Sequence, residues 1–131
     1  MSSVSTSAAA PINPTLFVLR NADMTLTTDQ TFSKVGTFTN YAITGIYATR
    51  KTGAFGVACV GGVYTGANKT ASTVLAAVQV WSGLTGAGTM QFATLANILQ
   101  AALTATPILN LTTGNTGALT TDLFITGISL D

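Results

Sequence analysis

Short segments in which apolar and polar residues alternate follow one another along most of the chain. The clearest is 41–49, in which Tyr41, Ile43 and Tyr47 share one face of a strand if no bulge intervenes. In 119–130, Leu123 and Ile125 are two residues apart and share one face of a strand. Ile128 is three residues further on and shares that face only if the alternation is interrupted. Thr, Val, Ile, Tyr and Phe dominate these segments, and such residues suit a pleated, half-buried surface. The pattern therefore predicts β-strands.

Shorter alternating or apolar runs predict further strands at 16–19, 24–27, 32–35, 54–64, 73–81, 90–95 and 108–112. Clusters of Gly, Asn, Thr and charged residues predict turns or loops at 50–53, 65–70, 83–88 and 114–117. The pair Gly61-Gly62 lies inside one predicted strand, which indicates a bulge or a close approach of another backbone.

One segment fits two interpretations. Apolar residues near 96–105 fall at helical spacing, which predicts a short helix that Pro107 would end. Elsewhere about eight short strands follow one another without a βαβ rhythm. This is the pattern of an all-β antiparallel sandwich or barrel.

The chain is long enough for one core and too short for two. Residues 1–15 are rich in Ser and Ala and contain Pro11 and Pro14, so we expect a flexible N-terminal arm followed by one β domain at 16–131. The arm is either a disordered terminus or a segment that lies over a neighbouring subunit.

The charge content is unusually low. Only 7% of the 131 residues are charged, against about 25% in ordinary domains, and the net charge is +1. No charged residue lies between Thr70 and Thr121. A surface with so few charges suits a subunit that is permanently part of a larger assembly. Polar residues interrupt every apolar run, and 1–15 lack the features of a secretory signal, so we expect no membrane partner.

The residues needed for catalysis are scarce. The chain has no His and no Glu, and Cys59 therefore has no base to activate it. Asp23 and Asp29 could flank a metal ion, but turn hydrogen bonds are the commoner role for such residues. Lysines at 34, 51 and 69 suit strand edges better than a Ser–Lys pair. We expect no enzyme activity, no catalytic residues, no cofactor and no metal.

Two binding functions depend on residue types that can be read from the sequence. Arg50 and Lys51 form the only adjacent basic pair, which is too little for a nucleic-acid partner. Sugar binding needs exposed aromatic rings, for which the candidates are Trp81, Tyr41, Tyr47 and Tyr64. Aromatic residues on alternating strands more often belong to the core.

Four segments resemble a family of small tailed-bacteriophage virion proteins. They are Tyr41-Ala-Ile-Thr-Gly-Ile46, Gly61-Gly-Val-Tyr-Thr-Gly-Ala-Asn-Lys69, Val78-Gln-Val-Trp-Ser-Gly-Leu84 and Leu119-Thr-Thr-Asp-Leu-Phe-Ile-Thr-Gly127. The resemblance covers about residues 20–130. It departs from the family pattern at 92–107.

The resemblance implies a jelly-roll-like sandwich that serves as a head decoration, or cement, protein. Such a protein lies on the capsid surface of a virion as a homotrimer, with the major capsid protein and its own copies as partners. A coat or tail subunit and a sugar-binding host-attachment module are the alternatives. A genome-packaging coat usually has a basic arm, and 1–15 contain no Lys or Arg.

Overall fold

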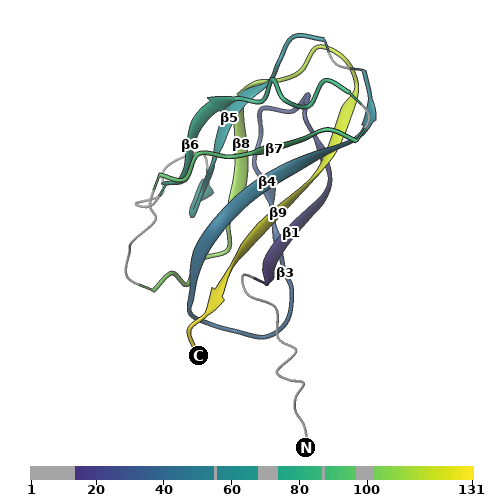
Figure 1. Cartoon of the computed structure of the whole chain (residues 1–131). Coiled ribbons are helices and arrows are strands. Elements are labelled where there is room, and N and C mark those ends of the chain that lie inside the picture. The colour runs from purple at the N-terminus through teal and green to yellow at the C-terminus, as the bar shows by residue number, and fades with distance from the viewer. Residues whose placement is uncertain (1–13, 55, 68–73, 87, 97–101) are drawn as a thin grey trace, which may run out of the picture.

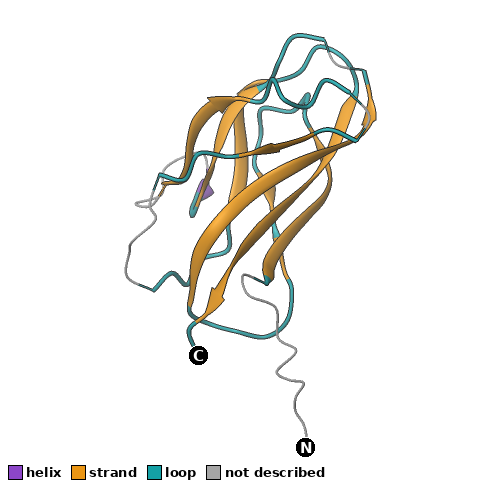
Figure 2. Cartoon of the chain, viewed as in Figure 1, coloured by secondary structure: helices purple, strands orange, loops and turns teal. Residues whose placement is uncertain are grey.

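A computed structural model describes residues 14–54, 56–67, 74–86, 88–96 and 102–131, apart from the side chains of 74 and 77. Within these ranges the chain forms strands joined by loops and turns (Figure 2). The strands are β1 (Thr15–Asp23), β2 (Gln30–Thr31), β3 (Ser33–Lys34), β4 (Tyr41–Gly53), β5 (Val60–Tyr64), β6 (Val74–Val80), β7 (Met90–Phe92), β8 (Ile108–Thr113) and β9 (Leu119–Ser129).

The strands form two antiparallel sheets. One has five strands in the order β3-β1-β9-β4-β7, and the other has four in the order β2-β8-β5-β6 (Figure 1). When the two-residue β3 is set aside, the strand orders β1-β9-β4-β7 and β2-β8-β5-β6 are those of a jelly roll, in which the chain changes sheet at every connection except that between β5 and β6. The predicted all-β antiparallel sandwich is confirmed.

The core lies between the inner faces of the two sheets. β9 alternates regularly, with Leu119, Leu123 and Ile125 buried, as the sequence pattern predicts. Ile128 falls on the opposite face and is 49% exposed. Across the core lie Val63, Leu75, Leu109 and Leu111 of the second sheet, all buried. Each sheet therefore contributes one apolar face, as sandwich packing requires.

A bulge in β4 decides which side of the sheet Tyr47 occupies. The pairing of β4 with β9 shifts register between Ile43 and Gly45. Tyr41 and Ile43 are buried before the shift, and Ile46 and Ala48 are buried after it. Because one extra residue reverses the alternation, Tyr47 turns to the outer face. The predicted shared face of Tyr41, Ile43 and Tyr47 is therefore not formed.

Three local predictions are wrong. Residues 50–53 continue β4 rather than turn, because they pair with the start of β9. Residues 24–27 form a turn after β1, in which the Leu26 amide donates to the Asp23 carbonyl at 3.2 Å. The strand expected at 54–64 begins only at Val60.

The helix expected near 96–105 falls largely on 97–101, outside the described residues. The described residues at either side are not helical. Leu95 and Leu103 each form an isolated β-bridge, to Ala76 and Tyr41 respectively. The N-terminal arm expected at 1–15 lies outside the described part up to residue 13, and β1 begins at Thr15.

The prediction for the glycine pair is confirmed. A Cβ at Gly61 would lie 2.5 Å from both the Asn110 carbonyl oxygen and the Leu111 Cα on β8. The pairing of β5 is also irregular on both sides of this residue. The Gly61 carbonyl accepts a hydrogen bond at 3.3 Å from the indole of Trp81, which is fully buried. Gly61 thus lets β8 and the indole approach β5 closely.

Gly61→Ala should destabilise the fold by about 2–3 kcal/mol, because the two closest clashes are with backbone atoms of Asn110 and Leu111, which cannot move away as a flexible side chain can. Chemical denaturation would measure the change. Gly86→Ala is the matched control, since its nearest neighbour is a side-chain methyl of Thr89 at 3.3 Å. Equal losses for the two variants would contradict the close-approach argument.

Burial also raises the pKa values of Tyr41, Cys59 and Tyr64, the first two by the larger amounts. The pKa of Tyr41 rises from 10.0 to about 12, and that of Cys59 from 9.0 to about 11, because the charged forms are poorly solvated. The folded state therefore keeps these protons at a pH where the unfolded chain releases them. The free energy of unfolding should fall as the pH rises from about 9 towards 12.

Urea denaturation of the wild type and of Cys59→Ala, followed from pH 8 to 11, measures this effect. The variant should lose less stability above pH 9, since it lacks the thiol whose pKa shifts from 9.0. Parallel curves for the two proteins would show that the thiol does not contribute.

Candidate interaction surface

The outer face of the five-stranded sheet carries a row of aromatic side chains. β7, β4, β9 and β1 lie side by side in the sheet (Figure 1). Phe92 is the direct cross-strand partner of Tyr47, and Tyr47 is the partner of Phe124. The ring centroids are 5.6 Å and 5.1 Å apart, and the second pair is stacked. We call these three residues the aromatic row.

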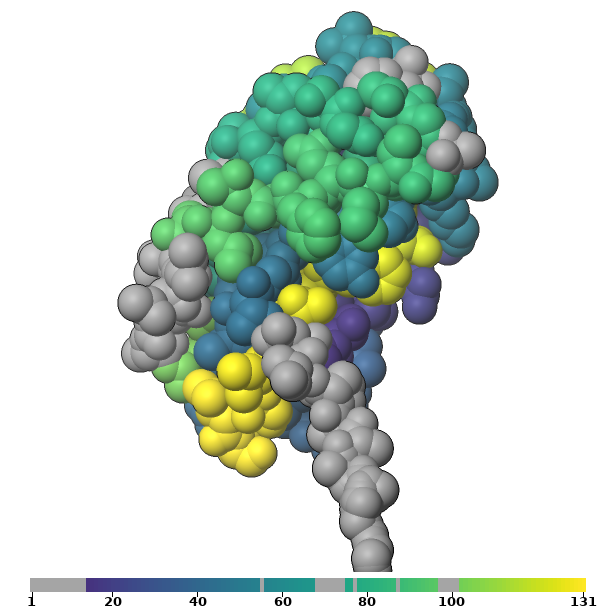
Figure 3. Space-filling view, viewed as in Figure 1, coloured from purple at the N-terminus to yellow at the C-terminus, as the bar shows by residue number. Residues whose placement is uncertain are grey.

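The aromatic row is accessible to solvent. Phe92 is 67% exposed, and Tyr47 and Phe124 are half-buried. Beyond Phe124 the row continues to its β1 partner, Val18. Met90 adds a further exposed side chain on β7. In space-filling view the part of the chain that contains β7 borders atoms of β4, and atoms of β9 are visible next to them (Figure 3). Exposed apolar groups gathered in this way usually mark an interaction site.

The outer edge of β7, which pairs with no other strand among the described residues, adjoins the aromatic row. β7 is the outermost strand of its sheet. On the side that faces β4, the backbone carbonyl of Thr89 accepts a hydrogen bond from the backbone amide of Arg50 at 2.9 Å. The backbone amide of Ala93 donates to the carbonyl of Ile46 at 2.7 Å. Because successive residues of a strand bond to opposite sides, Met90 and Phe92 present their amides and carbonyls at the open edge. An extended segment could pair there.

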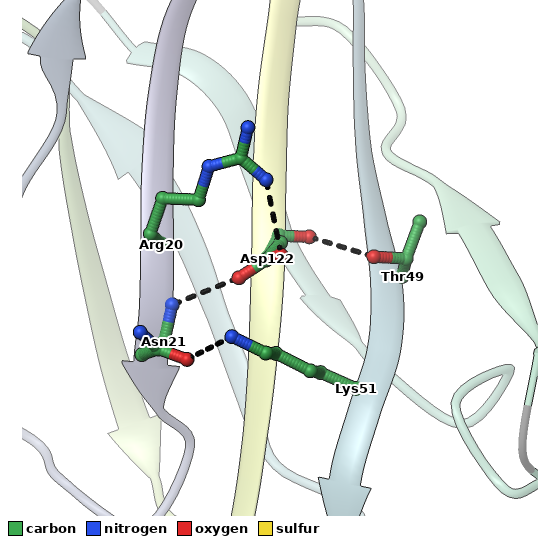
Figure 4. A network of polar contacts seen from close by, with 5 residues as sticks. All are labelled: Arg20, Asn21, Thr49, Lys51 and Asp122. Carbon is green, nitrogen blue, oxygen red and sulfur yellow. Dashed lines mark hydrogen bonds and ion pairs between the residues drawn. The ribbon is translucent and has the colours of Figure 1, made fainter.

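A polar network lies on the same face beside the aromatic row (Figure 4). One carboxylate oxygen of Asp122 accepts a hydrogen bond from the backbone amide of Asn21 at 2.9 Å. The other oxygen accepts one from the guanidinium of Arg20 at 3.3 Å. Thr49 donates to the Asp122 carbonyl at 3.4 Å, and Lys51 donates to the Asn21 side chain. Asp122 thereby connects β9 to β1 where Asn21 adopts a φ of 55°.

The network also keeps cations close to the sheet. The Arg20 guanidinium lies 5.3 Å from the centre of the Phe124 ring, a cation–π distance, while it pairs with Asp122. Lys51 is bound to Asn21. The charged side chains of this network, Arg20, Asp122 and Lys51, therefore bind neighbouring groups at one side of the aromatic row. The three side chains of the row carry no charge themselves.

The two aspartates considered as metal ligands accept hydrogen bonds from different partners. Asp23 accepts from the amide and the hydroxyl of Thr25, at 3.0 and 2.6 Å, as a turn aspartate does. Asp29 accepts from the buried Asn110 side chain at 2.5 Å. Among the described residues, no three acidic or sulfur side chains come together as metal ligands do.

Three of the four aromatic residues proposed as a sugar platform lie in the core. Trp81, Tyr41 and Tyr64 are buried, and only Tyr47 reaches the surface. Its surface neighbours, Phe92 and Phe124, are residues that the sequence reasoning missed. Phe124 lies at an outward position of the regularly alternating β9, so an aromatic residue at a polar position was the available signal.

The remaining candidates have structural roles. Lys34 lies on the short edge strand β3, where it donates to the Phe38 carbonyl and covers the Phe38 ring at 4.8 Å. Lys69 lies outside the described residues. Cys59 is fully buried. The surface of the described part holds no pocket, and no helix in it could span a membrane.

A comparison of the chain with protein-family models, curated proteins and solved structures found no match.

Phe92→Ala should reduce stability by no more than about 1 kcal/mol, because the ring is 67% exposed and loses little burial. Phe17→Ala is the matched comparison. Phe17 is 1% exposed, so the loss of its ring should lower the free energy of unfolding by about 3–5 kcal/mol. Thermal and urea denaturation of both variants measure the difference. A large loss for Phe92→Ala would mean that the aromatic row is part of the core.

Proposed function

We propose that this protein is a virion structural protein, a head decoration subunit that binds and stabilises the outside of a phage capsid. It works as a homo-oligomer, most simply a trimer, and its partner is the major capsid protein. The motif resemblance to tailed-phage virion proteins leads to this proposal. The jelly-roll order of the two sheets agrees with it, since this arrangement is common in capsid proteins.

The observation that carries the proposal is the exposed aromatic row on a surface where the described residues form no pocket. Phe92, Met90 and their neighbours offer a flat, neutral area, which suits contact with a protein surface better than enclosure of a small ligand. Interfaces concentrate binding energy in buried aromatic residues surrounded by polar groups. The network around Asp122 supplies such a polar rim.

The alternatives fit these observations less well. A coat subunit that packages a genome usually has a basic arm, which 1–15 lack. A sugar-binding module needs open ring faces, but Tyr47 and Phe124 stack on one another at 5.1 Å and Trp81 is buried. A tail subunit would also bind other virion proteins through such a surface. Only the identity of the partner protein distinguishes a tail subunit from a decoration subunit.

Sedimentation of the purified chain, alone and mixed with undecorated capsids, tests the proposal. We expect a small discrete oligomer alone and co-sedimentation at stoichiometric occupancy with capsids. Phe92→Ser should lower the occupancy at least tenfold if the aromatic row contributes to the assembled form. Thr112→Ala, an exposed change on the opposite sheet, is the control.

Each other outcome refutes the decoration role. Closed shells formed by the chain alone would identify a coat protein. A stable monomer at micromolar concentration that ignores capsids would favour the tail or sugar-binding alternative, and a glycan array would separate these two.

A further inference from the structure

We propose that the side chains of Gln79 and Gln91 close one side of the sandwich and thereby prevent the edge of β6 from pairing with a second copy of the chain. We call these two side chains the glutamine clasp. The proposal concerns the edge of the four-stranded sheet. It depends neither on capsid binding nor on the aromatic row.

The glutamine clasp lies where the edges of the two sheets meet. β6 is the outermost strand of one sheet, and β7 is the outermost strand of the other. The chain that leaves β7 continues to β6, where Leu95 forms a β-bridge with Ala76. The next backbone amide, that of Ala96, donates to the carbonyl of Leu75 at 3.0 Å. Residues 90–96 therefore pair first with one sheet and then with the other.

Both glutamine side chains project from the inner faces of their sheets. Gln91 is the cross-strand partner of Ala48, which is buried in the core. Gln79 is the partner of Gly61, which pairs on its other side with the buried Leu111. Direct partners in an antiparallel ladder place their side chains on the same face of the sheet. The two glutamines can therefore reach across the gap between the sheets.

Each glutamine binds backbone groups on the far side of this gap. The side-chain nitrogen of Gln91 donates to the carbonyl of Val80 on β6 at 3.0 Å. Its oxygen accepts a hydrogen bond from the backbone amide of Gly83 at 2.7 Å. In the other direction, the side-chain oxygen of Gln79 accepts one from the backbone amide of Thr94 at 3.3 Å. The glutamine clasp thus holds the segment after β7 against β6.

The sequence of β6 explains why its edge needs protection. Its seven residues, VLAAVQV, include no charge, no Pro and no Gly, and segments of this kind favour open-ended assembly between chains. Val78 and Val80 are also 53% and 51% exposed. Natural edge strands are often protected by Lys, but the chain has no charged residue between Thr70 and Thr121. The glutamine clasp provides an uncharged substitute for that protection.

Replacement of both glutamines by Met tests the proposal, because Met keeps an unbranched side chain of similar length but forms none of these hydrogen bonds. Gln30→Met is the matched control. Gln30 also binds backbone, with two hydrogen bonds of 2.9 Å to Asp23, but it lies on the two-residue β2 at the other end of the sheet. Urea denaturation identifies conditions in which all the proteins have the same folded fraction.

Under these conditions sedimentation and thioflavin T fluorescence follow assembly. Gln79→Met/Gln91→Met should form growing, thioflavin-positive assemblies about tenfold faster than Gln30→Met or the wild type. Addition of Val78→Lys to the double variant should restore the wild-type rate. Val78 lies exposed on β6, so the lysines of two copies would repel one another at a shared edge.

Three outcomes would overturn the proposal. Equal assembly rates for the double variant and Gln30→Met would show that lost stability, and not an opened edge, causes assembly. Assembly that is as fast with Val78→Lys as without it would exclude pairing through β6. A double variant that stays as discrete as the wild type would show that the edge needs no protection. If the double variant does not fold, Gln91→Met alone takes its place, since it keeps the bond between Gln79 and Thr94.

Discussion

The insertion of β9 between β1 and β4 is the pairing on which the rest of the molecule depends. The ladder with β4 runs from the pair Tyr41 and Ser129 to the pair Gly53 and Leu119, and a second ladder joins β9 to β1. β9 thus holds together two strands that precede it by many residues. Its inner side chains fill the core, and its outer side chains place Phe124 and Asp122 on the surface. Such non-local pairing implies slow folding, because distant segments must meet first.

The sequence predicted those parts of the fold that follow from regular alternation. In β9 every second residue is buried, so the direction of Leu123 and Ile125 followed directly from the pattern. Gly61 was informative because a strand glycine indicates a close approach of another backbone. Backbone atoms of β8 lie only 2.5 Å from the place that a Cβ of residue 61 would occupy. An antiparallel sandwich with polar loops could be inferred from these local signals. They contain no information on the order of strands within a sheet.

The prediction failed where long-range pairing overrides the local pattern. The bulge near Gly45 is stabilised by the register with β9, and it sends Tyr47 outward although its spacing from Tyr41 suggests the same face. Residues 50–53 have the composition of a turn, yet the start of β9 holds them as a strand. The aromatic row combines residues of three strands, so no single segment could reveal it. Of the four aromatic residues considered for a sugar platform, Trp81, Tyr41 and Tyr64 belong to the core, which was the commoner role for such residues, and only Tyr47 lies at the surface.

The neutrality of the aromatic row has a consequence for the conditions under which it can work. Ion pairs at a protein surface weaken as ionic strength rises, because mobile ions screen them. Contacts between apolar groups do not weaken in this way, and salts that are excluded from the protein surface strengthen them. The chain lacks charge from Thr70 to Thr121, a stretch that includes Phe92 and Met90. A contact made through these residues would therefore persist from dilute fresh water to concentrated brine.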